Sequence, residues 1–152
     1  MTGVQTCALP ICFPVTILGF NTWRAPRTWK ATTNSNFFGR FIRSAHYVKS
    51  GDGSKKAIWK IPIKGEGTYE VFSYVTKMRR GPRRDNQDGG EYTYAVYHNG
   101  EKENVVIDLK TIDDGWNSLG SFYFTGDTAK VELANKSSAP VVVADAIKLV
   151  KQ

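Results

Sequence analysis

The sequence predicts an all-β domain, an antiparallel β-sandwich of the jelly-roll-like kind with about seven or eight strands. Short alternating segments recur at roughly 10–15-residue spacing, with turn-forming residues between them. No segment sustains a helical period. Aromatic residues make up 12% of the 152 residues and hydrophobic residues 41%, which suits one packed domain and excludes a disordered chain.

Eight segments carry the strand pattern. Residues 67–76 are apolar on both faces, as expected of a central strand in a sandwich. Asn99-Gly100, within a loop at 99–103, predicts a hairpin. Three successive valines at 141–143 favour a strand, because β-branched side chains lose rotamer freedom in a helix. The predicted strands are Arg40–Lys49, Lys56–Ile63, Gly67–Thr76, Tyr92–His98, Asn104–Leu109, Trp116–Phe124, Thr128–Ala134 and Pro140–Val150.

The start of the chain resembles the conceptual translation of a sequencing-library adapter, with residues 1–11 spelling MTGVQTCALPI. Both cysteines of the chain fall at or inside this string, so disulfide, zinc and thiol chemistry lose their only residues. We therefore expect the natural N-terminal region of the protein to be missing. The predicted organisation is an artefact at 1–12, an irregular N-terminal arm at 13–39 that packs on the domain, and the sandwich at 40–152.

Few residues suit catalysis. The sequence holds no G-x-S-x-G, H-E-x-x-H or glycine-rich phosphate motif, and its two imidazoles, His46 and His98, are far apart. No apolar run approaches the roughly 18–20 residues that a membrane span needs. Asp145 lies in an apolar strand, where we expect backbone or hydroxyl donors to satisfy it; a calcium ligand is the alternative. The sequence therefore predicts no enzyme, no cofactor and no metal.

A basic loop at 77–91 is the most unusual feature of the chain. Planar guanidinium groups bind carboxylate, sulfate or phosphate through paired hydrogen bonds. With a net charge of +7, the loop is compatible with acidic polysaccharide, lipid phosphate or nucleic acid as a partner. The alternative is a solvated loop without a specific role. Four arginines define the loop: Arg79, Arg80, Arg83 and Arg84.

Exposed aromatic rings are the second type of candidate, because a flat ring stacks on the C–H face of a sugar. Tyr97 has the opposite strand parity from Val96, and Tyr123 the opposite parity from Phe124. Both tyrosines are therefore expected to face outward. They complete the predicted ligand-binding set with the four arginines.

Five motifs in the same order resemble the golvesin C-terminal-like domain, also called the xanthan lyase carbohydrate-binding-like domain, over about residues 40–152. The resemblance implies a non-catalytic β-sandwich accessory module of extracellular or cell-envelope proteins. It also implies that five aromatic residues pack in the core: Trp59, Tyr94, Trp116, Phe122 and Phe124. The basic loop is the main departure from the shared pattern. The motifs are W-K-I-P-I at 59–63, G-x-Y-E-V at 67–71, Y-x-V-x-H-N-G at 94–100, G-W-x-x-L-G-x-F-x-F at 115–124 and V-V-A-D-A-I at 142–147.

Two hypotheses for function follow. The first is a carbohydrate-binding-like module of a larger exported protein, favouring acidic polysaccharide as its partner. The second is a structural or docking module that packs against a missing N-terminal domain of the same chain and binds no glycan. A nucleic-acid-binding domain ranks below both, and its mark would be affinity that falls steeply with salt.

Overall fold

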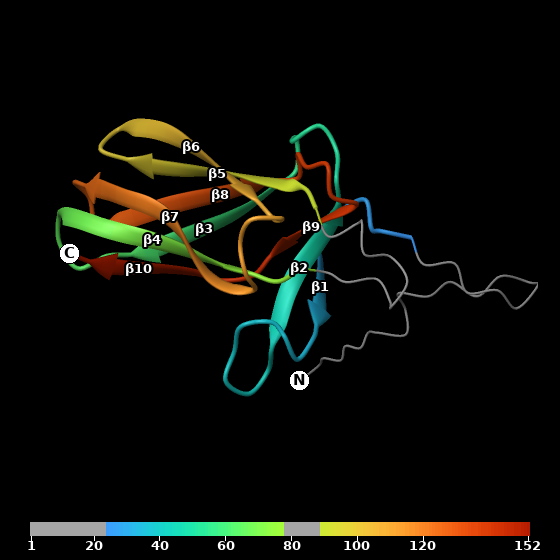
Figure 1. Cartoon of the computed structure of the whole chain (residues 1–152). Coiled ribbons are helices and arrows are strands. Elements are labelled where there is room, and N and C mark those ends of the chain that lie inside the picture. Colours follow the sequence, from blue (N-terminus) through green and yellow to red (C-terminus); the bar gives the residue numbers. More distant parts are fainter. Residues whose placement is uncertain (1–23, 78–88) are drawn as a thin grey trace, which may run out of the picture.

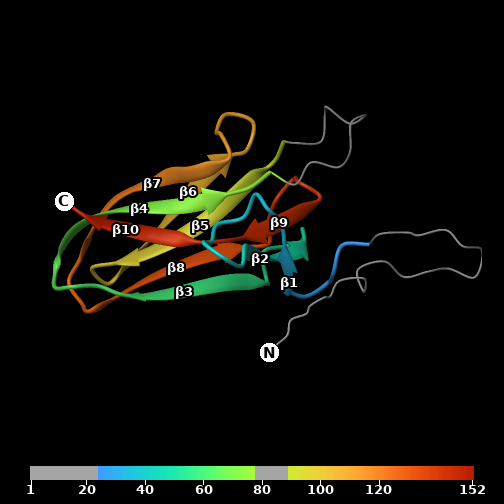
Figure 2. The same ribbon diagram turned by 90° about the horizontal axis from the view of Figure 1, so that it is seen from below.

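The computed structural model describes residues 24–77 and 89–152, which form ten strands in three antiparallel sheets. The sheet β3-β8-β5-β6 packs against the sheet β10-β4-β7, and the sheet β1-β2-β9 lies at one end of this sandwich (Figures 1 and 2). The prediction of an all-β sandwich is confirmed. The strands are β1 (Lys30–Thr33), β2 (Ser44–Lys49), β3 (Lys56–Pro62), β4 (Gly67–Val75), β5 (Glu91–His98), β6 (Glu101–Asp108), β7 (Gly115–Phe124), β8 (Thr128–Ala134), β9 (Val141–Ala144) and β10 (Ile147–Lys151).

The core lies between the sheets β3-β8-β5-β6 and β10-β4-β7 and is formed by alternate residues of their strands. In β4 the buried positions alternate with half-exposed ones, as the period of a strand requires. The Ser73 and Tyr94 hydroxyls, 2.7 Å apart, join the sheets through a buried hydrogen bond. Tyr92 accepts a hydrogen bond from the Val143 N–H at 3.0 Å, and burial raises the pKa of its phenol to about 12. Buried hydroxyls are thus paired, as an apolar interior demands.

The C-terminal strand predicted at 140–150 is two strands. β9 pairs with β2 and β10 pairs with β4, so the chain passes from the end sheet into the sandwich at Asp145. The Phe38 N–H donates a hydrogen bond to Asp145 Oδ2 at 3.0 Å, which confirms the expected backbone donor. An alternation pattern reports that a segment is extended, and it does not report which sheet the segment joins.

β1 lies within the segment predicted as an irregular arm. It pairs with the edge strand β2 through its backbone, and three of its four residues are exposed. Such a strand leaves no apolar alternation in the sequence. Trp29, just before β1, packs against the main core. The strand predicted from Arg40 begins only at Ser44, because residues 40–43 belong to the β1–β2 loop.

The hairpin between β5 and β6 is tighter than predicted. Its turn is Asn99-Gly100 alone, with φ of 46° and 78°, and β6 already begins at Glu101. Positive φ at both central positions is the mark of the two-residue turn that matches the twist of antiparallel strands. The first three residues of β6 are exposed and polar, so this part of the strand shows no apolar alternation in the sequence.

A bulge in β7 changes which side of the sheet its residues face. Val71 pairs with Gly120 and Phe72 pairs with Ser118, so Leu119 is an extra residue with no partner in β4. One extra residue reverses the parity of a strand. Phe122 is therefore buried, whereas Trp116 lies on the outer face. The expectation that Trp116 packs in the core is wrong for this reason.

Candidate functional site

The predicted ligand-binding residues fall in separate places. Arg79, Arg80, Arg83 and Arg84 lie outside the described residues, so their role stays a prediction. Tyr97 lies on the outer face of β3-β8-β5-β6, and Tyr123, which is 46% exposed, lies on the outer face of β10-β4-β7. The structure places each tyrosine outward, as parity predicts, and does not bring them together.

The outer face of β3-β8-β5-β6 carries a row of cations. Lys60 pairs with Lys130, Lys130 pairs with Tyr97, and Tyr97 pairs with Lys102. The row thus crosses all four strands, with neighbouring strands about 4.8 Å apart. Lys56 lies on the same side of β3, four residue pairs from Lys60. We call this surface the lysine face and define it by Lys56, Lys60, Tyr97, Lys102 and Lys130.

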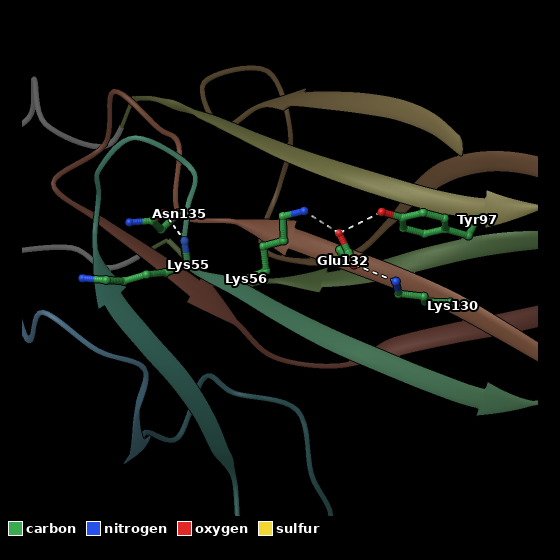
Figure 3. Close-up of polar contacts among 6 residues, drawn as sticks. All are labelled: Lys55, Lys56, Tyr97, Lys130, Glu132 and Asn135. Carbon is green, nitrogen blue, oxygen red and sulfur yellow. Dashed lines mark hydrogen bonds and ion pairs between the residues drawn. The ribbon is translucent and has the colours of Figure 1, made fainter. Parts of the chain in front are cut away.

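Glu132 organises the lysine face from within the sheet. It is only 5% exposed, and its carboxylate accepts hydrogen bonds from Lys130 Nζ at 2.8 Å, Lys56 Nζ at 3.0 Å and the Tyr97 hydroxyl at 3.1 Å (Figure 3). Burial alone would raise the pKa of this carboxyl, but the three hydrogen bonds outweigh burial and lower the pKa to about 2. The group is therefore ionised at neutral pH.

The ring of Tyr97 is itself occupied. Lys130 Nζ lies over the ring, 4.1 Å from its centroid, and Lys102 Nζ lies at 6.0 Å. These are cation–π contacts, with the ammonium groups over the electron-rich face of the phenol. A sugar could stack on this ring only by displacing Lys130. The geometry gives Tyr97 the role of holding two lysines in place across the sheet.

Asn135 fixes the end of the sheet beside the lysine face. Its side-chain oxygen accepts hydrogen bonds from the backbone N–H groups of Lys55 at 3.0 Å (Figure 3) and Gly53 at 3.1 Å. Its amide nitrogen donates a hydrogen bond to the Lys49 carbonyl. A Cβ on Gly51 would lie 2.7 Å from the Asn135 amide nitrogen. This buried amide therefore holds the β2–β3 turn against the end of β8.

The outer face of β10-β4-β7 is different in character. Tyr74 of β4 pairs with Trp116 of β7, and their ring centroids are 5.2 Å apart in an edge-to-face arrangement. Phe38, from the β1–β2 loop, lies 5.0 Å from Trp116 and 5.5 Å from Tyr74. Phe72 lies two residues before Tyr74, and Lys148 Nζ is 4.6 Å from both the Phe72 and Trp116 rings. We call Phe38, Phe72, Tyr74 and Trp116 the aromatic face.

Polar groups adjoin the aromatic face. Ser118, the partner of Phe72, donates a hydrogen bond from its hydroxyl to Glu70 Oε1 at 2.8 Å. Asp145 lies at the base of the β1–β2 loop and holds the Phe38 N–H. Burial raises the pKa of the Asp145 carboxyl to about 6, against the opposing effect of that hydrogen bond. This face is absent from the predicted site because the bulge that turns Trp116 outward leaves no signal in the alternation of the sequence.

Neither face contains a group of side chains suited to a metal. Among residues 24–77 and 89–152, no cluster of three or more histidine, cysteine, aspartate or glutamate side chains could hold an ion. None of these residues belongs to a helix long and apolar enough to cross a bilayer.

The fold and its two outer faces define a β-sandwich module whose candidate sites lie on sheet surfaces rather than in a deep cleft. The golvesin C-terminal domain model matches residues 19–151, and the chain belongs to that family. The chain is also similar in structure to a Paenibacillus xanthan lyase, with a TM-score of 0.66 and 24% sequence identity. The match covers 82% of this chain and 11% of the lyase chain. A comparison with curated proteins found no match.

Proposed function

We propose that this chain is a non-catalytic carbohydrate-binding accessory module of a larger, exported protein, and that its lysine face recognises acidic polysaccharide outside the cell or in the cell envelope. The observation that carries the proposal is a row in register across the sheet, in which three strands contribute Lys60, Lys130 and Lys102 and the fourth contributes Tyr97. Family membership and the fold shared with a small part of a xanthan lyase support the accessory role.

The lysine row suits a polymer better than a small anion. An exposed charge pair contributes little, about 0–1 kcal/mol, so a single carboxylate would bind weakly. A polysaccharide with repeated carboxylates engages several lysines at once, and the contacts then act together. The buried carboxylate of Glu132 reduces the motion of Lys56 and Lys130 before any ligand arrives. Pre-ordering lowers the entropy lost on binding. The four arginines of the basic loop would add to the same attraction.

The low pKa of Glu132 favours binding over catalysis. A general acid or base works best with a pKa near the operating pH. Glu132, with a pKa of about 2, already accepts three hydrogen bonds and has little tendency to take up a proton. Glu132 therefore serves as a fixed negative charge that pairs with Lys56 and Lys130.

The docking hypothesis rests on a separate observation. Phe41 and Ile42, at the tip of the β1–β2 loop, are 88% and 76% exposed. Large apolar side chains this exposed are typical of contact surfaces. A neighbouring domain of the parent protein is the partner that this candidate function requires.

Binding of a polyuronate such as polygalacturonate tests the first function. We expect the double variant Lys60→Ala/Lys102→Ala to lose about tenfold in affinity, because each substitution removes one contact with the polymer. Neither lysine bonds Glu132, so the arrangement of Lys56 and Lys130 is left intact. Lys30→Ala/Lys64→Ala removes the same charge from exposed positions on β1 and in the β3–β4 turn, outside the lysine face, and should lose less than about twofold. Affinity electrophoresis at fixed ionic strength measures both.

Equal losses in the two variants would contradict the lysine face as the site. A variant with serine at all four arginine positions, 79, 80, 83 and 84, measures the share of the basic loop in the same assay. Wild-type protein that binds no acidic polymer would instead favour the docking function.

A further inference from the structure

The aromatic face lies where a sandwich normally shows polar side chains to water. Outward positions of β4 and β7 pair Tyr74 with Trp116 and Phe72 with Ser118. All three rings lie outside the main core cluster and are half-buried. A group of large rings on the solvent side of a sheet is costly to leave in water and is commonly functional.

Hydrogen-bonding groups follow the rings in the next rows of the same two strands. Glu70 pairs with Ser121, and Thr68 pairs with Tyr123. Glu70 accepts one hydrogen bond, from Ser118, through Oε1. It forms no ion pair within the described part of the chain. These rows therefore place hydroxyls and a carboxylate beside the rings, together with the exposed side chains of Tyr123 and of Val150, the partner of Glu70 in β10.

This arrangement matches the surface of a pyranose. A sugar ring presents an apolar face of C–H groups and a rim of hydroxyls, and binding sites for such ligands combine apolar walls with a few placed polar groups. A protein interface core would need apolar side chains where this face has serine, threonine and glutamate. A lipid surface would disfavour the Glu70 carboxylate.

The charges on this face point to an uncharged sugar. Glu70 carries a carboxylate, and the ammonium of Lys148 is already engaged over the rings of Phe72 and Trp116. A carboxylated sugar placed on the rings would bring its own carboxylate close to that of Glu70, and these two negative charges would repel each other. The lysine face, by contrast, carries cations in a row.

We propose that the aromatic face is a second saccharide site, distinct from the lysine face, that binds uncharged pyranose residues through stacking on Trp116 and Tyr74. The Glu70–Ser118 pair bonds the sugar hydroxyls. Phe38 extends the platform from the β1–β2 loop, and the hydrogen bond from its N–H to Asp145 sets its position.

Affinity electrophoresis in gels containing hydroxyethylcellulose, galactomannan or xyloglucan tests this site. We expect at least one of these neutral polymers to retard the wild-type protein. Trp116→Ala should weaken that binding at least tenfold, whereas Trp116→Phe keeps a stacking ring and should retain most of it. Phe41→Ala removes an aromatic side chain that is 88% exposed at the loop tip and should leave binding unchanged.

Two further measurements separate this site from the lysine face. Lys60→Ala/Lys102→Ala should leave neutral-polymer binding intact, and raising salt tenfold should change it less than twofold. Ser118→Ala, a small change on the surface, should weaken binding severalfold even if Trp116→Ala impairs folding. The proposal is overturned if no neutral polymer retards the wild type, or if Trp116→Ala and Ser118→Ala both bind as the wild type does.

Discussion

The two outer faces of the sandwich present opposite chemistry on the same type of scaffold. The lysine face has cations on three of four strands, and two of them, Lys56 and Lys130, bind a carboxylate that is 5% exposed. The aromatic face has rings across two strands, and Phe38 from a loop covers their edges. Charge acts over distance and weakens with salt, whereas ring contacts are short-ranged and insensitive to salt. A sheet surface thus takes its specificity from its outward positions while its inward positions maintain the fold.

The faces also differ in what fixes their side chains. On the lysine face, Glu132 lies in the same sheet as the lysines it orders, so the arrangement depends on strand pairing alone. On the aromatic face, the position of Phe38 depends on Asp145, which lies between β9 and β10. The first arrangement is local, and the second depends on how the end sheet joins the sandwich.

The largest effect should come from the inner side of the four-stranded sheet. Trp59 and Ile58 are neighbours in β3, but Trp59 packs against the core and Ile58 is 52% exposed. We expect Trp59→Ala to lower the free energy of unfolding by about 3 kcal/mol, and Ile58→Ala by less than about 0.5 kcal/mol. Urea titrations of both variants measure this. Similar losses would mean that the sheet does not separate its fold side from its lysine face.

A smaller effect is expected at the centre of the lysine face. Glu132→Gln removes a counter-charge from two lysines and should lower stability at pH 7 by about 1–2 kcal/mol, since both lysines are partly in water. The carboxyl pKa is about 2 in the folded protein against 4.5 ordinarily, so its stabilisation is complete above about pH 4.5 and is lost as pH falls toward 2. Urea midpoints of wild type and variant should converge over that range. A constant difference would contradict this account.

The smallest effect concerns the base of the aromatic face. Asp145 has a pKa of about 6 in the folded protein against 3.8 ordinarily, so the folded state binds more protons between these values. Its contribution to stability therefore decreases as pH rises from about 4 to 6. Asp145→Asn keeps an oxygen acceptor for the Phe38 N–H and should raise stability at pH 7 by about 1 kcal/mol, with no gain at pH 4. Thermal melting at the two pH values checks this. A variant destabilised at pH 7 would mean that the charge itself holds the loop.

Alternation and turn residues predicted where the strands lie, because burial on one side leaves a period of two in the sequence. The same signal does not assign a strand to a sheet. β9 and β10 form one extended apolar segment in the sequence, and only pairing with β2 and β4 separates them. β1 left no signal because it is exposed on nearly all positions.

The candidate site was harder to predict than the fold. Tyr97 was found by parity, but the lysines around it belong to three other strands, and their register is a property of the folded sheet. The family resemblance implies a core position for Trp116, whereas the bulge in β7 places its side chain on the outer face. Gly120 is the local sign of the bulge, with a φ of 123° that disfavours other residues. A glycine inside a predicted strand therefore indicates a possible bulge, beyond which the inward-facing and outward-facing positions exchange.

The segment from Val141 to Lys151 supplies a strand to the end sheet and a strand to the sandwich. Both of its partners, β2 and β4, are made about 70–100 residues earlier during synthesis. Neither of these two sheets is complete until these residues have left the ribosome, so the domain gains its full cooperativity only after its last two strands have been made. Contacts between such distant parts of a chain also slow folding. A nascent chain stalled before residue 141 would present the unpaired edges of β2 and β4 to other chains, which makes this interval the most exposed to misassembly.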